Sequence, residues 1–168
     1  MRRTLIAIVL AAALPAAAQS VPAANYTDMW WNPSESGWGI SFAQHSGGGQ
    51  SNQVLAVWYT YDPRDPDTST GATTDFKPLW LVMPGGVWST PTSITGDVYV
   101  TNGTPFAQSW NNSSLGVQKV GTFTFTFSST ASGTFSYNIA PPAGLASTNP
   151  AFGLPALTGA KSIQRQTF

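Results

Sequence analysis

Apolar and polar residues alternate along most of this chain, and this two-residue period is the feature that most restricts its fold. Successive side chains of a β-strand point to opposite faces, so a strand with one buried face repeats every two residues. The clearest case is Phe123, Phe125 and Phe127, which alternate with threonines and precede the similar segment 133–137. We expect these two segments to form an antiparallel hairpin with the phenylalanines on one face.

The same alternation predicts seven strands, with a possible short one at 105–110, and no stretch after residue 18 keeps a helical period over three turns. Turn-sized gaps between consecutive strands favour an antiparallel meander. We therefore expect an all-β fold, a meander of seven or eight strands closed or nearly closed into a small barrel, with a β-sandwich as the alternative. The seven strands are expected near residues 37–45, 53–61, 78–83, 93–101, 119–128, 133–140 and 161–167.

Two of the expected strands are apolar on both faces. In the strand at 53–61, Leu55 and Tyr59 alternate with Ala56 and Trp58, and the strand at 78–83 has the same character. Only one face of a curled sheet points into the core. The other face needs a cover, which the N-terminal segment, a loop, a ligand, another subunit or lipid can supply. In sequence, the nearest cover is the segment 26–39.

The N-terminus has the layout of a secretory signal. Two arginines precede an apolar run over residues 5–14 and a small-residue stretch that ends at Ala18. We expect residues 1–18 to be a cleaved signal peptide and residues 19–168 to form a single β-barrel-like domain of a secreted or periplasmic protein. The apolar run is too short to cross a bilayer as a helix, so we expect no transmembrane helix.

Composition excludes several classes of function. Without the two arginines of the signal, five Lys and Arg stand against seven Asp and Glu, so no basic patch is left for nucleic acid. The chain has no cysteine, which rules out disulfides, thiolate metal sites and a cysteine nucleophile. Only 8% of the residues are charged while 12% are aromatic, which is typical of short strands joined by turns.

Tryptophan is concentrated near the start of the expected domain, where three of the seven lie within residues 30–39. Sugar rings stack on indoles, and a nearby carboxylate or amide supplies hydrogen bonds. Because a chain of this size does not readily hide all its large rings, we expect two to four of them to line a groove, a pocket or an interface. The predicted ligand-binding residues are Trp30, Trp31, Asn32, Glu35, Trp38, Trp58, Tyr61 and Trp80.

The acidic residues allow two kinds of site. Asp28 and Glu35 flank the tryptophans, and glycosidases place two acids across an aromatic cleft. We favour the simpler interpretation that Glu35 accepts hydrogen bonds in a turn. Asp62, Asp65 and Asp67 are weak calcium candidates, but their spacing lacks the EF-hand pattern and a solvated acidic turn is favoured. The single histidine has no nucleophile motif beside it. We therefore expect no catalytic residues, no bound metal and no cofactor.

Four segments of the chain match a familiar ordered set of motifs. These are a Trp-Trp-Asn-Pro-x-Glu-Ser-Gly-Trp-Gly opening, a Trp-[Phe/Tyr]-x-Tyr-Asp strand, a Gly-x-Pro-x-Trp turn and a Thr-Arg-Gln-x-Phe end. With them the chain resembles an exported proteobacterial β-domain family, found alone, repeated or appended to secreted peptidases and other hydrolases, with no established activity. The segments that carry the resemblance are Tyr26–Gly39, Trp58–Asp62, Lys77–Trp80 and Lys161–Phe168.

The resemblance covers nearly all of residues 19–168, with two departures. The chain inserts Pro63–Phe76 where the family has a short turn, and Gln164 replaces the usual threonine before the last arginine. The family's habit of joining other secreted proteins implies a role in recognition or surface attachment. It adds no catalytic residue.

Four functions follow from these observations, in order of preference. The first is an exported noncatalytic domain that binds glycan or another cell-envelope ligand through a tryptophan-rich face. The second is a structural or interaction module, either of a homo-oligomer or as an accessory to a secreted hydrolase. An outer-membrane barrel comes third, because neither face of the last expected strand suits lipid. A glycoside hydrolase comes last.

Overall fold

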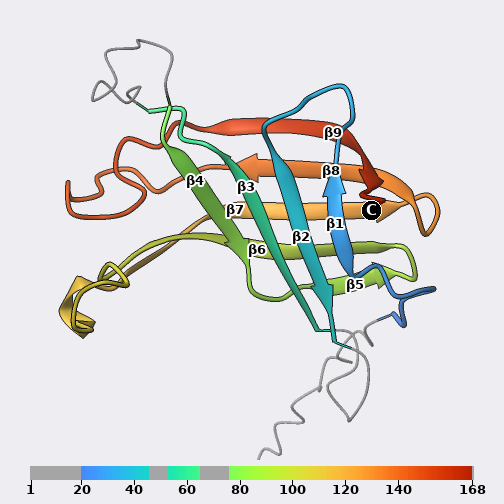
Figure 1. Ribbon diagram of the computed structural model, residues 1–168, viewed down its shortest axis with the longest axis horizontal. Coiled ribbons are helices and arrows are strands. Elements are labelled where there is room, and N and C mark those ends of the chain that lie inside the picture. Colours follow the sequence, from blue (N-terminus) through green and yellow to red (C-terminus); the bar gives the residue numbers. More distant parts are fainter. Residues whose placement is uncertain (1–19, 46–52, 65–75, 168) are drawn as a thin grey trace, which may run out of the picture.

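Eight antiparallel strands close into a barrel, and a ninth short strand pairs with one of them (Figure 1). The computed structural model describes residues 20–45, 53–64 and 76–167. Within these residues, the only helix is the 3-10 helix η2, Asn112–Ser114. The strands are β1 Asp28–Trp31, β2 Gly39–Gln44, β3 Val54–Tyr61, β4 Pro78–Met83, β5 Val87–Thr90, β6 Ser93–Asn102, β7 Gly116–Phe127, β8 Ser132–Ile139 and β9 Leu157–Arg165.

The strands follow one another around the barrel in chain order. Neighbours in sequence pair from β1 to β4 and from β6 to β9, and β1 pairs with β9 to join the two halves. One residue pair, Val82 with Tyr99, joins β4 to β6 and closes the ring, while β5 lies outside it and pairs with β6. In Figure 1, β2 to β4 cross steeply in front of β6 to β9. The predicted meander barrel is confirmed, and the sandwich alternative is wrong.

The prediction of a short strand at 105–110 is wrong, because residues 106–108 lie in a turn and their neighbours at 105, 109 and 110 belong to no strand. Pro105 has no amide hydrogen for a sheet ladder. The hydroxyl of Thr104 instead accepts a hydrogen bond from the amide of Asn111 at 2.9 Å and donates to its carbonyl oxygen at 3.1 Å. The segment is therefore a closed loop between β6 and β7.

Two strands were not predicted, and two predicted ends need correction. β1 and β5 have four residues each, which is too short to display an alternation. The strand expected from residue 37 begins at Gly39, because Gly37 takes a φ of +106° in the preceding turn. The last strand begins at Leu157 rather than at residue 161.

Aromatic rings fill the inside of the barrel. Phe123, Phe125 and Phe127 of β7 are buried while the threonines between them point outward, as the sequence pattern predicts. Phe125 stacks on Phe135 of β8 with ring centroids 5.1 Å apart, and Trp58 of β3 lies edge-on to Phe135 at 5.3 Å. Burying each ring removes about 150–250 Å² from water, so this packing is the main source of stability.

The two ends of the barrel differ. At one end the segment before β1 packs against the sheet. There the amide of Ser20 donates to the carbonyl oxygen of Trp88, and Tyr26 stacks on Phe127 with ring centroids 3.9 Å apart. We call the opposite end the loop end. The segments that emerge there are 32–38 after β1, 62–64 after β3, 103–115 after β6 and 140–156 after β8.

The outer surface has a polar region and an apolar region. Over β6 to β9 the outward positions are mostly threonine and serine, and the hydroxyls of Thr95 and Thr124 lie 2.8 Å apart. Over β3 and β4 they include Leu55, Tyr59 and Trp80, which are exposed. The segment 26–39 contributes β1 and the start of β2 to the barrel wall. As one candidate cover for the apolar region, this segment contacts Tyr61 but leaves Leu55, Tyr59 and Trp80 exposed.

Candidate functional site

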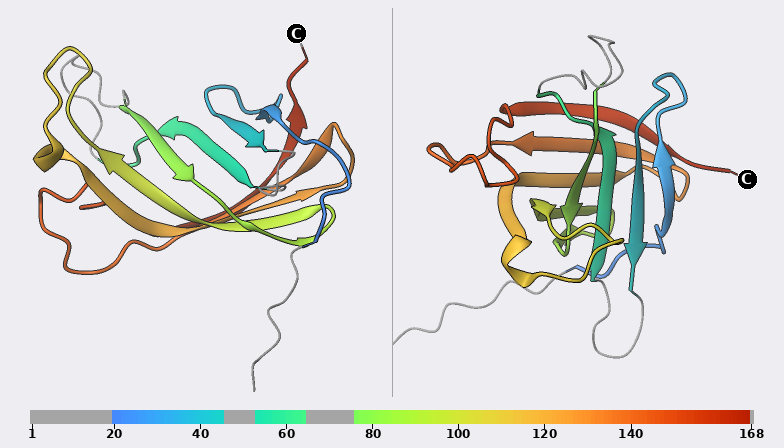
Figure 2. Two further views of the ribbon diagram at one scale, coloured as in Figure 1. Left: turned by 90° about the horizontal axis from the view of Figure 1, so that it is seen from below. Right: turned by 60° about the vertical axis from the view of Figure 1, so that its left-hand side comes forward.

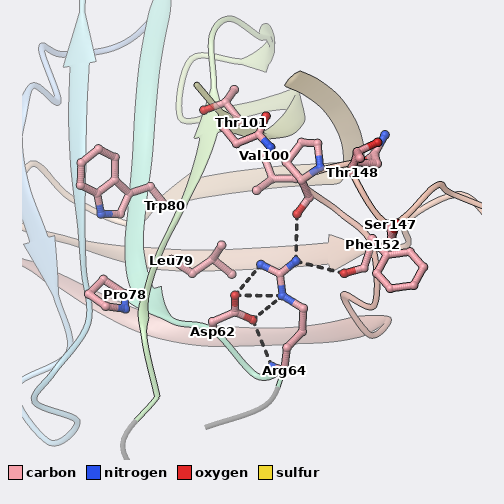
Figure 3. A pocket seen from close by; sticks show the side chains of 13 residues that line it. Asp62, Arg64, Pro78, Leu79, Trp80, Val100, Thr101, Ser147, Thr148 and Phe152 are labelled. Atoms are coloured by element: carbon pink, nitrogen blue, oxygen red, sulfur yellow. Dashed lines mark hydrogen bonds and ion pairs between the residues drawn. The ribbon is translucent and has the colours of Figure 1, made fainter. Parts of the chain in front are cut away.

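A hollow opens in the barrel wall where β4 and β6 diverge toward the loop end (Figure 3). Its volume is about 590 Å³. Leu79 of β4 and Val100 of β6 are its buried members, and Figure 3 shows Trp80 on the opposite side of β4 from Leu79, at the outer rim. The lining residues are Asp62, Arg64, Pro78, Leu79, Trp80, Val100, Thr101, Asn102, Ser147, Thr148, Asn149, Pro150 and Phe152.

Arg64 links two sides of this hollow. Its Nε donates to Oδ1 and Oδ2 of Asp62 at 2.7 and 2.9 Å, and its Nη2 also pairs with Asp62. Its Nη1 donates to the carbonyl oxygens of Pro150 and Phe152 at 2.9 and 3.1 Å. The guanidinium therefore fastens the residues after β3 to the 140–156 connection. Each such charge-assisted bond contributes about 1.5–3 kcal/mol.

The ion pair leaves the hollow polar and nearly neutral. Burial alone raises the pKa of Asp62, but hydrogen bonds and charge from Arg64, aided by Lys77, outweigh burial and hold that pKa below its ordinary value. Asp62 is therefore ionised at neutral pH and matches the charge of Arg64. The other polar side chains of the lining are hydroxyls and amides, such as Thr101 and Asn102. This lining suits an uncharged ligand with many hydroxyl groups.

Three aromatic residues, Trp31, Tyr59 and Trp80, lie on the outer face beside the hollow, and we call them the aromatic row. Tyr59 of β3 pairs with Trp80 of β4 on one side and with Gly39 of β2 on the other. The rings of Tyr59 and Trp80 meet edge-on with centroids 6.3 Å apart, and Trp80 is 63% exposed. One step further along the β1–β2 register, Trp31 comes opposite Gly39. Because Gly39 has no side chain, the surface between Trp31 and Tyr59 is left open.

Glu35 holds the turn between β1 and β2. It accepts a hydrogen bond from Trp38 Nε1 at 3.1 Å and another from Lys161 Nζ at 3.0 Å. The bond from Lys161 lowers the pKa of Glu35, and the same bond raises the pKa of Lys161. The ring of Tyr61 lies against this turn, 3.3 Å from where a Cβ on Gly37 would stand. Glu35 therefore stabilises the turn, but its donors are the side chains of Trp38 and Lys161 and not the backbone amides of Ser36, Gly37 or Trp38 that we expected.

Trp30 and Trp58 lie in the core. Trp30 is 1% exposed, its Nε1 donates to the carbonyl oxygen of Tyr26 at 3.0 Å, and the guanidinium of Arg165 lies 5.3 Å from the ring centroid. Trp58 is also buried, and its Nε1 has no hydrogen-bond acceptor among the described residues. Neither ring reaches the outer face.

The eight residues predicted to bind a ligand therefore fall in three places. The outer face carries Trp31, Tyr61 and Trp80, the β1–β2 turn carries Asn32, Glu35 and Trp38, and the core holds Trp30 and Trp58. Only the residues of the outer face and of the turn can contribute to one surface. Tyr61 connects these two groups, because its ring packs on the β1–β2 turn.

Each of the four carboxylates among the described residues forms an ion pair. Asp28 pairs with Arg165 at 3.1 Å, and Glu35 pairs with Lys161. The two acids considered as a glycosidase pair thus engage different cations of β9. The remaining carboxylates are those of Asp62 and Asp97.

Of the three calcium candidates, the structure describes only Asp62. Asp65 and Asp67 lie outside the described residues, and Asp62 is engaged by Arg64. The part of the chain that the structure describes contains no group of three side chains suited to hold a metal ion. The solvated acidic turn, favoured over a calcium site at this loop, stays a prediction.

Sequence reasoning missed the residues that shape the hollow. The contact between Arg64 and Phe152 joins positions 88 residues apart, and no local pattern marks either of them. It also missed the exposure of Phe106 and Trp110, because a strand was expected there. The apolar character of both faces of β3 and β4 was the one signal that located the surface beside the hollow.

Comparison with models of protein families, with proteins of curated function and with solved structures gave no match. Within the described residues, no helix has the length and apolar character needed to cross a membrane. We therefore infer the function from the geometry of the hollow and the aromatic row.

Proposed function

We propose that this protein is an exported noncatalytic domain that binds glycan on the outer face of β1 to β4. The observation that carries the proposal is the position of Trp80. Its indole is 63% exposed, meets Tyr59 edge-on, and stands at the rim of a hollow lined by hydroxyls and amides. Exposed rings beside hydrogen-bonding side chains match the two surfaces of a sugar, its C–H face and its hydroxyl groups.

The polar lining supplies the hydrogen bonds that a bare aromatic face lacks. Thr101 of β6 lies on the far side of the hollow from Trp80 (Figure 3), and its neighbour Asn102 also lines the hollow. A sugar that stacks on Trp80 can place its next unit in the hollow, where these groups replace water. A purely apolar partner would leave these polar groups unpaired, at about 1–3 kcal/mol each.

The state of the acids supports binding without catalysis. A glycosidase needs one carboxyl with a raised pKa that donates a proton to the leaving group. Here Glu35 and Asp62 have lowered pKa values and contact Lys161 and Arg64. Neither is therefore suited to be a general acid at neutral pH.

Retention on insoluble glycan tests this proposal. We expect purified peptidoglycan or chitin to retain the protein, and Trp80→Ala to reduce retention about tenfold, since it removes one stacking surface. Trp110→Ala is the matched control, because it removes another exposed indole that does not line the hollow, and it should bind like the wild type. Equal retention of both variants and the wild type would overturn the proposal.

A second copy of the chain is the competing occupant of this face. Light scattering over a range of protein concentrations separates the two cases. A dimer that dissociates on the Trp80→Ala substitution would assign the face to self-association instead of glycan. A monomer that binds glycan would support the proposal.

A further inference from the structure

The connection between β6 and β7 presents two aromatic rings to solvent. Phe106 is fully exposed and Trp110 is 66% exposed, whereas most large rings of the barrel are buried. Figure 2 shows this connection, coloured yellow, projecting beyond the barrel at the loop end. Exposed aromatic residues at a convex tip have an apolar surface that water solvates poorly.

The loop that carries these rings is ordered by its own hydrogen bonds. Thr104 bonds the amide and the carbonyl of Asn111, as described above, and the amide of Gln108 donates to the carbonyl oxygen of Pro105 at 3.0 Å. The side chain of Asn111 then accepts from the amide of Ser113 at 3.0 Å, which starts η2. The rings are thus held outward by a structured loop, so little conformational entropy is lost when they are buried.

The chemistry of the loop matches the interface of a lipid bilayer. No Asp, Glu, Lys or Arg lies between Asp97 and Lys119, so no charge has to be removed from water when the tip is buried. The rest of the loop offers hydroxyls and amides, which hydrogen-bond in the headgroup layer. Indole is the side chain most typical of that layer, since it has an apolar body and one N–H donor. A protein partner would instead need a pocket shaped to this tip.

We propose that the 103–115 connection is a membrane-interface anchor that inserts Phe106 and Trp110 at the headgroup level of a bilayer. Leu115 and Val117 are also exposed at the loop end and would extend the inserted surface. Burial of the two rings removes about 300–500 Å² from water, which supports reversible surface binding rather than spanning. This anchor is independent of the glycan face, and either can fail without the other.

Because the chain has no cysteine, a single introduced cysteine can report on the tip alone. We would label Ala107→Cys with an environment-sensitive dye and add uncharged phosphatidylcholine vesicles. We expect the emission to shift to the blue and rise, with the same affinity for vesicles that contain anionic phosphatidylglycerol, because the loop carries no charge. Label at Ala131→Cys, in the turn between β7 and β8 at the opposite end, should not respond.

Replacing Phe106 and Trp110 together by serine should weaken vesicle binding about tenfold or more. Trp80→Ala is the matched control and should bind vesicles like the wild type. No dye response at position 107, or unchanged vesicle binding of the double variant, would overturn the proposal. A response without vesicles that grows with protein concentration would assign the tip to a second copy of the chain and overturn it as well.

Discussion

The Nζ of Lys161 lies 3.0 Å from Oε1 and 2.9 Å from Oε2 of Glu35, across 126 residues of sequence. The pair joins the first turn of the barrel to its last strand. Both side chains are more than one third exposed, so solvent screens the interaction and its contribution to stability is modest. Its dependence on pH nevertheless has a definite sign.

This ion pair predicts a window of pH in which it stabilises the fold. The pKa of Glu35 is lowered, so its contribution is lost as the pH falls through that lowered pKa. The pKa of Lys161 is raised, so its contribution is lost as the pH rises through that raised pKa. We expect the Tm difference between the wild type and Glu35→Gln to be largest between about pH 5 and pH 10. Thermal unfolding at a series of pH values measures it, and a difference independent of pH would contradict this role.

Trp30 should be the most costly tryptophan to remove. Its ring is buried, its Nε1 donates to Tyr26 and Arg165 lies over its face. We expect Trp30→Ala to lower the free energy of unfolding by about 3–5 kcal/mol. The exposed Trp110→Ala should change it by less than about 0.5 kcal/mol. Urea unfolding compares the two, and similar losses would mean that the packing of Trp30 is not as described.

Gly96 marks a place where two backbones approach closely. A Cβ at this position would stand 2.0 Å from the carbonyl oxygen of Gly85 and 2.7 Å from Cγ of Met83, which is buried. We expect Gly96→Ala to destabilise the barrel by about 1–3 kcal/mol, because the backbone must shift. Gly103→Ala has no atom within 4 Å of its Cβ and serves as the control. Equal Tm values for the two variants would show that the contact relaxes freely.

The fold could be predicted because its signal is local. The alternation of Phe123, Phe125 and Phe127 with threonines sets both the strand and its buried face, and the short gaps set the meander. β1 has only four residues, and the adjacent Trp30 and Trp31 point to opposite faces. The local pattern of so short a segment does not say which ring is buried, Trp30, and which is half-buried, Trp31.

The site could not be predicted to the same extent, because strand register and contacts between residues far apart in the sequence determine where its side chains lie. Trp58 and Trp80 both lie in strands that are apolar on two faces, so either face can be the buried one. The register with β2 and β4 places Trp58 inside and Trp80 outside. The hollow depends on β4 and β6 meeting at a single pair and on Arg64 reaching Pro150, which only the closed barrel brings together.

Replacing Arg64 should loosen the 140–156 connection locally. Lysine keeps the charge but lacks the planar fork that bonds Asp62 and two carbonyl oxygens together. We expect Arg64→Lys to speed amide exchange at Phe152 and Leu154, whose amides donate to Asn149 and Ala151 within this connection. Exchange in the β7–β8 hairpin should not change. Hydrogen exchange followed by mass spectrometry measures both, and unchanged exchange near Phe152 would contradict a fastening role for Arg64.

Gly39 gives the most selective test of the aromatic row, because it lies between Trp31 and Tyr59 on the outer face. The nearest atom to a Cβ at this position is the carbonyl oxygen of Trp30 at 3.5 Å, which is ordinary contact. Threonine should therefore fit, and its preference for strands should keep the Tm at or above that of the wild type. Its side chain would stand between the two rings and stop a sugar from lying across them. We expect Gly39→Thr to weaken glycan retention several-fold without loss of stability. Full retention by this stable variant would restrict the glycan to Trp80 and the hollow.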